Sequence, residues 1–179
     1  MDKQKYFYHS SPNCDLKYIE PRKNTVPIGF NEGEVVFATD SLPFSTMFIV
    51  PHDDSWANGG TFNDVPYFVI SDKERFLKAD KGGCIYLVSS KSFVQYNRRE
   101  LFSKEKIKVQ HKIRFESGLM AMIILGVQVY FTDKVTYGKI RKAKDHGLSI
   151  LNKMVSENEM LGFPSGKLEM YFASKKLVV

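Results

Sequence analysis

Short runs of β-branched and aromatic residues, separated by glycine, proline and charged residues, recur along the first two thirds of this 179-residue chain. Runs of this kind predict β-strands. The strands that we expect span residues 6–10, 34–38, 66–70, 84–88 and 100–103. Residues 107–115 alternate apolar and polar side chains, which is typical of a strand with one buried and one solvated face.

Helical spacing is less frequent. Phe44, Met47 and Phe48 lie at i, i+3 and i+4 behind candidate caps at residues 39–41, which predicts a short helix ending before Pro51. The polar stretch that follows, residues 51–64, is interpreted as a mobile loop.

The second half of the chain gives a less regular pattern. A longer, interrupted helical pattern covers residues 137–160, with a possible break at Gly147. For residues 119–131 the periodicity does not decide between a strand and a mixed segment.

This pattern of many short strands, few helices and long loops indicates an α+β fold on a bent, split antiparallel sheet. The length fits one domain, and 43% hydrophobic with 26% charged residues is ordinary for a globular chain. We expect residues 1–135 to form the core. Residues 136–179 should add a helical segment and a final strand, at 167–172, to the same domain.

The two cysteines, Cys14 and Cys84, belong to no Cys-x-x-Cys motif and have no clear metal-ligand set around them. They predict a reduced, cytoplasmic protein. The N-terminal residues lack the apolar core of a signal peptide. The longest apolar run, residues 119–129, is interrupted by Gly126 and Gln128 and is too short to span a bilayer, so no membrane association is expected.

Charge is distributed unevenly between the halves of the chain. Residues 1–90 carry 9 basic and 12 acidic residues, and residues 91–179 carry 17 basic and 8 acidic residues. The second half, with a balance of +9, is either a surface for nucleic acid or another polyanion, or a solvated lysine surface.

Candidate chemistry begins at the first predicted strand, which delivers His9, Ser10 and Ser11 to its tip. Functional groups are often presented by loops at the ends of rigid elements. Two later segments, residues 35–40 and 97–103, are candidate partners for His9. If the three segments meet in space, they form a nucleotide site.

The order of these segments resembles the ADP-ribosyltransferase superfamily over about residues 6–115. The stretch from Tyr8 to Ser11 is similar to the family's first motif, a histidine at the end of the first strand. Val36–Thr39 is similar to the second motif, with phenylalanine or threonine in place of the expected tyrosine. Glu100, followed by the strand at 107–115, is similar to the third motif, a glutamate on a later strand.

This resemblance implies NAD as substrate and transfer of ADP-ribose to a protein or nucleic-acid acceptor. His9 would bond a ribose hydroxyl, and Ser10 or Ser11 would hold the nicotinamide amide. Glu100 would stabilise the cationic sugar as nicotinamide leaves. The remaining candidates for contacts with the nucleotide are an aromatic ring to stack on nicotinamide, Phe37 or Phe44, together with Thr39 and Arg22, the last for phosphate.

Each candidate also has a purely structural interpretation. Phe37 and Phe44 fit a hydrophobic core, and Thr39 fits a helix cap. His9 could cap a strand or satisfy a loop carbonyl. Glu100 could form a surface ion pair with its arginine neighbours and Arg22 could be a surface charge. The whole chain could therefore be a catalytically inactive relative, or a non-enzymatic basic module that binds nucleic acid.

One further cluster, His52-Asp53-Asp54, has the residue types of a metal site. Side chains of consecutive residues rarely converge on one ion, so we interpret it as a hydrated loop and expect no metal.

Overall fold

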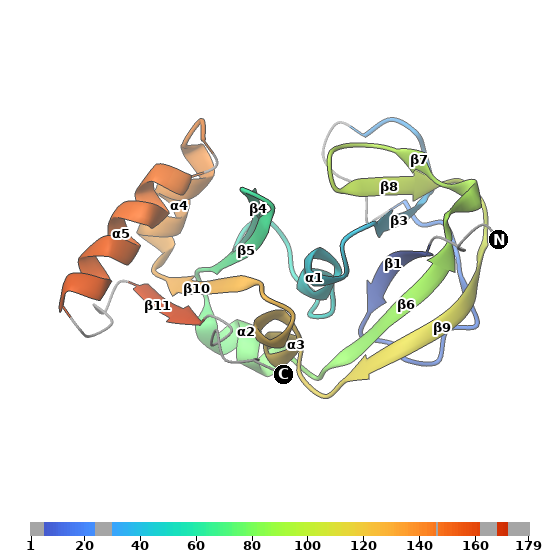
Figure 1. Cartoon of the computed structure of the whole chain (residues 1–179), viewed down its shortest axis with the longest axis horizontal. Coiled ribbons are helices and arrows are strands. Elements are labelled where there is room, and N and C mark those ends of the chain that lie inside the picture. Colours follow the sequence, from blue (N-terminus) through green and yellow to red (C-terminus); the bar gives the residue numbers. More distant parts are fainter. Residues whose placement is uncertain (1–5, 24–29, 146, 162–167, 172–179) are drawn as a thin grey trace.

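The computed structural model describes residues 6–23, 30–145, 147–161 and 168–171 (Figure 1). It has an α+β fold with two separate β-sheets and a few short helices. The larger sheet lies on one side of the molecule, the smaller sheet and the two C-terminal helices lie on the other, and α1 (Leu42–Ser45) lies between them.

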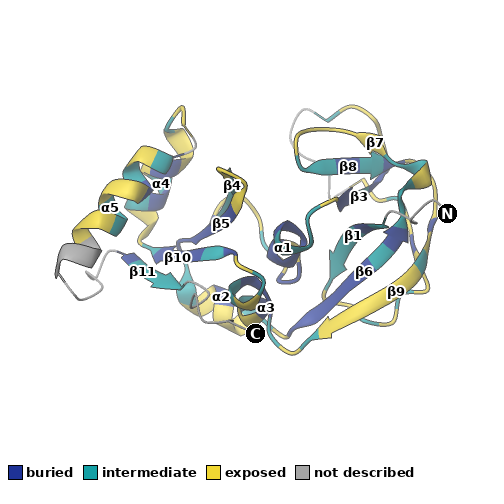
Figure 2. Cartoon of the chain, in the orientation of Figure 1, coloured by how far each residue is buried: buried dark blue, intermediate teal, exposed yellow. Residues whose placement is uncertain are grey.

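The larger sheet has seven strands in the order β2-β9-β6-β1-β3-β8-β7, and every neighbouring pair is antiparallel. The bounds of its strands are β1 Tyr6–Ser11, β2 Tyr18–Ile19, β3 Val36–Thr39, β6 Gly83–Ser89, β7 Val94–Gln95, β8 Glu100–Ser103 and β9 Ile107–Phe115. Every strand expected in this part of the chain is present. Figure 2 shows β9 exposed along most of its length, unlike the central strand β6.

The smaller sheet has four strands in the order β11-β10-β5-β4. Their bounds are β4 Ala57–Phe62, β5 Val65–Ile70, β10 Gln128–Thr132 and β11 Leu168–Tyr171. β5 and β10 are parallel, so the expectation of antiparallel pairing throughout is wrong at this one ladder. Parallel neighbours need a crossover connection, and here the chain passes through the larger sheet between β5 and β10.

The helices begin at polar caps. Ser41, Asp72, Ser117 and Asp133 accept hydrogen bonds from backbone N–H groups in the first turns of α1, α2, α3 and α4. The remaining bounds are α2 Lys73–Ala79, α3 Gly118–Ile124, α4 Lys134–Lys142 and α5 Leu148–Leu161, with 3₁₀ turns η1 at Thr46–Phe48 and η2 at Ser90–Ser92.

Apolar side chains gather in separate clusters on the two sheets. One cluster covers a face of the larger sheet and includes Phe7, Val36 and Tyr86. The largest lies under the smaller sheet and joins it to η1, α2 and α3. A third contains residues of β5, β10, α4, α5 and β11, so the described part of the segment 136–179 packs on the smaller sheet.

Two regions differ from the expected secondary structure. Residues 57–62, expected within a mobile loop, form β4 and pair with β5 from Ala57–Ile70 to Phe62–Val65. Residues 119–131, left undecided, contain α3 and β10 joined through Gly126, whose φ of 87° favours glycine. The break in the helical pattern at Gly147 is present between α4 and α5.

Among residues 6–23, 30–145, 147–161 and 168–171, no helix combines the length and the apolar character needed to cross a bilayer.

Candidate functional site

The three candidate segments form adjacent strands, β1, β3 and β8. β3 pairs with β8 along its whole length, from Val36–Ser103 to Thr39–Glu100. β1 and β3, in contrast, pair only at Tyr8–Thr39. The two strands therefore separate at His9, and the sheet opens at the tip of β1.

The His9 ring occupies this opening. Its Nδ1–H donates a hydrogen bond to the Phe37 carbonyl at 2.8 Å. Because a carbonyl oxygen only accepts, the proton of the neutral ring lies on Nδ1 and the lone pair of Nε2 remains available. Among the described residues Nε2 has no hydrogen-bond partner. His9 thus keeps one acceptor nitrogen that no described residue uses.

The surroundings favour the neutral form of this histidine. Desolvation by burial is the main cause that lowers the pKa of His9 below its ordinary value. The hydrogen bond to Phe37 opposes this shift, and the positive charge of Arg22 adds to it. The charge of Arg22 therefore acts on the His9 ring.

Arg22 is fixed through its backbone but not through its side chain. Its N–H donates to the Val35 carbonyl at 3.0 Å in an isolated bridge beside β3. The residue is exposed, and within the described ranges its guanidinium has no carboxylate partner. It is a cation without a carboxylate partner among the described residues, and its charge acts on His9.

The two serines after His9 are engaged within the fold. The Ser10 hydroxyl donates to the Ser45 carbonyl at 2.6 Å, which ties β1 to α1. The Ser11 hydroxyl accepts from the Asn13 N–H at 3.1 Å and shapes the turn that follows the strand. Each hydroxyl oxygen retains capacity for another hydrogen bond.

Thr39 and Glu100 are direct cross-strand partners, but their position relative to His9 is not the expected one. Side chains alternate along strands, so Thr39 and Glu100 share a face with Tyr8, whereas His9 starts from the opposite face. Two inter-strand spacings put the backbone of Glu100 roughly 10 Å from β1. Its carboxylate accepts from the Asn97 side chain at 2.6 Å. Thr39 is 3% exposed and accepts from the Ser41 N–H at 3.1 Å, in the turn before α1. The cap of α1 is Ser41, so the interpretation of Thr39 as the helix cap is wrong.

The two candidate aromatic rings lie in different surroundings. Phe44 is 8% exposed within the largest core cluster and offers little surface to a ligand. Phe37 is half-buried and packs against Phe30 and Tyr96, with ring centroids 5.2 and 5.8 Å away. Of the two rings, Phe37 is the more accessible, but like Thr39, two residues further along β3, it starts from the face of the sheet opposite to His9.

A contact between the two sheets beside Glu100 was not foreseen. Asp64, at the tip of the β4–β5 hairpin, accepts from the guanidinium groups of Arg98 at 2.9 Å and Arg99 at 2.7 Å. Arg99 also lies 4.0 Å from Asp40, and its buried Nε has no partner within the described part of the chain. The adjacent arginines were visible in the sequence, but no local signal pairs them with an acid about 35 positions away.

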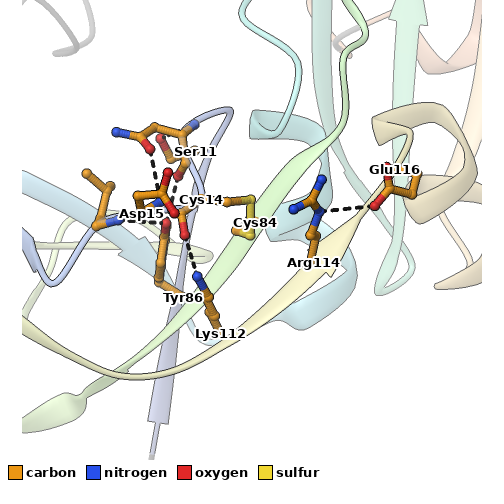
Figure 3. Close-up of a disulfide and its surroundings, with 10 residues drawn as sticks. Ser11, Cys14, Asp15, Cys84, Tyr86, Lys112, Arg114 and Glu116 are labelled. Atoms are coloured by element: carbon orange, nitrogen blue, oxygen red, sulfur yellow. Dashed lines mark hydrogen bonds and ion pairs between the residues drawn. A yellow bond between two sulfur atoms is a disulfide. The ribbon is translucent and has the colours of Figure 1, made fainter.

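A disulfide joins Cys14 to Cys84 (Figure 3). The expectation of reduced cysteines is therefore wrong, and with it the argument from cysteine to a cytoplasmic location. Cys84 is the cross-strand partner of Ser11, so the bond fixes the turn after β1 to β6. Lys112 Nζ donates to the Cys14 carbonyl at 2.6 Å in the same place. Seventy positions separate the cysteines, and spacing alone did not pair them.

The cluster at His52-Asp53-Asp54 is divided among separate structural contacts. His52 Nδ1 bonds the Val50 carbonyl at 2.9 Å and its ring packs on Phe68. Asp53 accepts from the backbone N–H of Ser55, and Asp54 accepts from the side chain of Asn58.

Two surface cavities lie away from the opening at His9. One of about 290 Å³ lies between β4, β5 and α4, and one of about 330 Å³ lies beside β7 and β8.

The chain was compared with family models, curated proteins and solved structures, and none of these matches it.

Proposed function

We propose that this protein binds NAD at the opening between β1 and β3 and transfers its ADP-ribose group to an acceptor, as ADP-ribosyltransferases do. The observation that carries the proposal is His9, two residues before the end of β1: a desolvated, neutral histidine whose Nε2 has no hydrogen-bond partner among the described residues, on the strand where the resemblance puts a ribose contact. A placed acceptor with perturbed acidity is a typical feature of a ligand site.

Neighbouring residues supply the other contacts that NAD needs. Arg22 provides a cation for the pyrophosphate, and guanidinium groups bind phosphate oxygens in pairs. Phe37 is the candidate ring for nicotinamide, and it would contact the ring from the face of the sheet opposite to His9. The oxygens of Ser10 and Ser11 can accept from the nicotinamide amide while each keeps its present bond.

The reaction breaks the bond between ribose C1′ and the nicotinamide nitrogen. Nicotinamide leaves with the bonding electron pair as a neutral molecule, and a nucleophile of the acceptor forms the new bond to C1′ and loses its proton. A carboxylate stabilises the cationic sugar in between, and Glu100 is the candidate for this role. To reach that position its side chain must exchange the Asn97 contact for the substrate.

Calorimetric titration of NAD tests the binding proposal. Wild type and His111→Ala should bind NAD, and His9→Ala should not. His111 is a matched control because it is an exposed histidine on β9 in the same sheet. Absence of binding to wild type, or equal binding to both variants, would overturn the site. Release of nicotinamide, measured by chromatography with and without added protein or RNA acceptors, then tests the transfer.

One observation favours a second candidate, a relative that binds NAD without cleaving it. Glu100 starts from the face of the sheet opposite to His9 and is held by Asn97. NAD binding that depends on His9, without any release of nicotinamide, would support this candidate over the first.

A further inference from the structure

The exposed side of α4 carries a set of lysines that we call the α4 lysine strip. It consists of Lys134, Lys139 and Lys142 on the helix and Lys144 directly after it, all exposed. At about 100° per residue, the three helical lysines fall within an arc of roughly 140°. The buried residues of the helix, Tyr137 and Ile140, point to the core instead.

The described carboxylates that flank the strip bond other groups. Asp133 accepts from Thr136, Asp145 accepts from Ser149, and Asp54 forms an ion pair with Arg141 at 3.0 Å. Within the described ranges no carboxylate pairs with any lysine of the strip. The strip is therefore a local surplus of positive charge, whereas lysines elsewhere, such as Lys104 and Lys106, have glutamate partners.

Helix stability does not account for the strip. Lys139 and Lys142 lie in the last turn, where positive charge is favourable to the helix dipole. Lys134 is the first residue of the helix, where the same charge is unfavourable. Lys134 is thus aligned with the other lysines although its charge disfavours the helix. This indicates that the row of lysines serves a purpose other than helix stability.

We infer that the α4 lysine strip is a docking surface for the phosphate backbone of nucleic acid. Lys134 and Lys142 are about 12 Å apart along the helix, a distance over which a nucleic-acid backbone presents several phosphates. Gly138 lies between them, and a Cβ added there would meet nothing within 4 Å, so the backbone can approach the helix closely. The net charge of +9 on the second half of the chain is positive, as the charge of the strip is.

The strip is separate from the site at His9. Figure 1 shows α4 beyond the smaller sheet, on the far side of the molecule from β1. The inference does not depend on NAD binding, and either can fail alone.

Fluorescence anisotropy with a labelled 20-base-pair DNA duplex tests the docking surface over a range of salt concentrations. We expect wild type to bind with a slope of log K against log salt of about −3, because three or four phosphates are neutralised. The strip variant, with Lys134, Lys139 and Lys142 changed to Gln, should lose at least tenfold in affinity and most of the slope. The control variant changes Lys17, Lys78 and Lys91 to Gln, which removes equal charge from exposed sites elsewhere.

The outcomes are distinct. A large loss in the strip variant alone, with thermal unfolding and NAD titration unchanged, supports the surface. Equal losses in strip and control variants, no binding by wild type at 50 mM salt, or equally effective competition by polyglutamate would overturn it. Loss of NAD binding in His9→Ala with DNA binding intact would show that the two sites are independent.

Discussion

His9 and Phe37 are joined by a hydrogen bond of 2.8 Å at the point where β1 and β3 separate. The bond fixes the tautomer of the histidine, because the carbonyl accepts and Nδ1 must donate. The other ring nitrogen, Nε2, can accept a hydrogen bond only while the ring is neutral. A hydrogen bond from a ligand to Nε2 therefore depends on the protonation state of His9.

This coupling predicts the pH dependence of NAD binding. Desolvation lowers the pKa of folded His9 below its ordinary value of 6.5, so the neutral form of the ring predominates from pH 8 to 6.5. Affinity should be constant over that range and should fall only at lower pH, as the ring gains a proton. Titrations between pH 5 and 8 measure this midpoint. A midpoint at or above 6.5 would contradict the desolvated environment, and weak but pH-independent binding is expected for His9→Asn.

Glu100→Gln should separate binding from chemistry. A carboxylate that stabilises a cationic sugar acts mainly in the transition state, so NAD affinity should stay close to that of wild type. Nicotinamide release should fall at least tenfold. Glu116→Gln, which changes an exposed glutamate paired with Arg114, is the control and should keep full activity. Unchanged turnover in Glu100→Gln would exclude Glu100 as the catalytic group.

The strands of the larger sheet could be predicted because each is a compact apolar run bounded by turn residues. Val35–Phe37 and Cys84–Val88 contain the β-branched and aromatic residues that strands favour. The adjacency of β1, β3 and β8 was only a condition of the proposed site, since no local pattern specifies which strands pair. His9 was singled out by the polar residues that follow an apolar run, but its bond to Phe37 depends on where two strands separate.

Features that depend on tertiary contacts could not be predicted. Residues 57–62 are rich in glycine and polar groups, and β4 exists because it pairs with β5 and packs on the core. A Cβ at Gly59 would lie 2.6 Å from the Met47 sulfur, so the glycine reflects close packing and not a mobile loop. The disulfide and the contact of Asp64 with Arg99 join distant segments in the same way.

We expect the Asp80 carboxylate to contribute strongly to the free energy of unfolding. Its carboxylate accepts from the N–H groups of Gly118, Leu119 and Gly82 and from the Ser117 hydroxyl, at 2.7 to 3.1 Å. Asp80→Ala should lower the free energy of unfolding by about 2–3 kcal/mol, because buried N–H groups lose a charged acceptor. Urea denaturation measures this. Asp72→Ala, which removes a single cap of α2, should cost about 1 kcal/mol. Equal effects would contradict the special role of Asp80.

We also expect the difference in stability between wild type and Asp80→Ala to depend on pH. Burial by itself would raise the pKa of Asp80, but the hydrogen bonds from Leu119, Gly118, Ser117 and Gly82 outweigh it and hold the pKa below its ordinary value. The contribution is fully present above the unfolded pKa and is lost as pH falls through the folded one. The difference between wild type and Asp80→Ala, measured in urea, should therefore be constant from pH 5 to 7 and shrink below about pH 4. A constant difference down to pH 2 would argue against a lowered pKa.

The Cys14–Cys84 disulfide should contribute to stability more than to the geometry of the site. Crosslinking residues 70 positions apart restricts the unfolded chain, by about 4 kcal/mol on the chain-entropy estimate. In the folded state the turn has other attachments, because the Tyr86 hydroxyl donates to the Asn13 carbonyl at 2.7 Å and accepts from the Leu16 N–H at 3.2 Å. The double variant Cys14→Ser, Cys84→Ser should therefore unfold at lower urea yet bind NAD much as wild type does. Dithiothreitol should destabilise wild type and leave the double variant unchanged. If dithiothreitol has no effect on wild type, or if the double variant loses NAD binding while still folded, the disulfide has a different role from the one argued here.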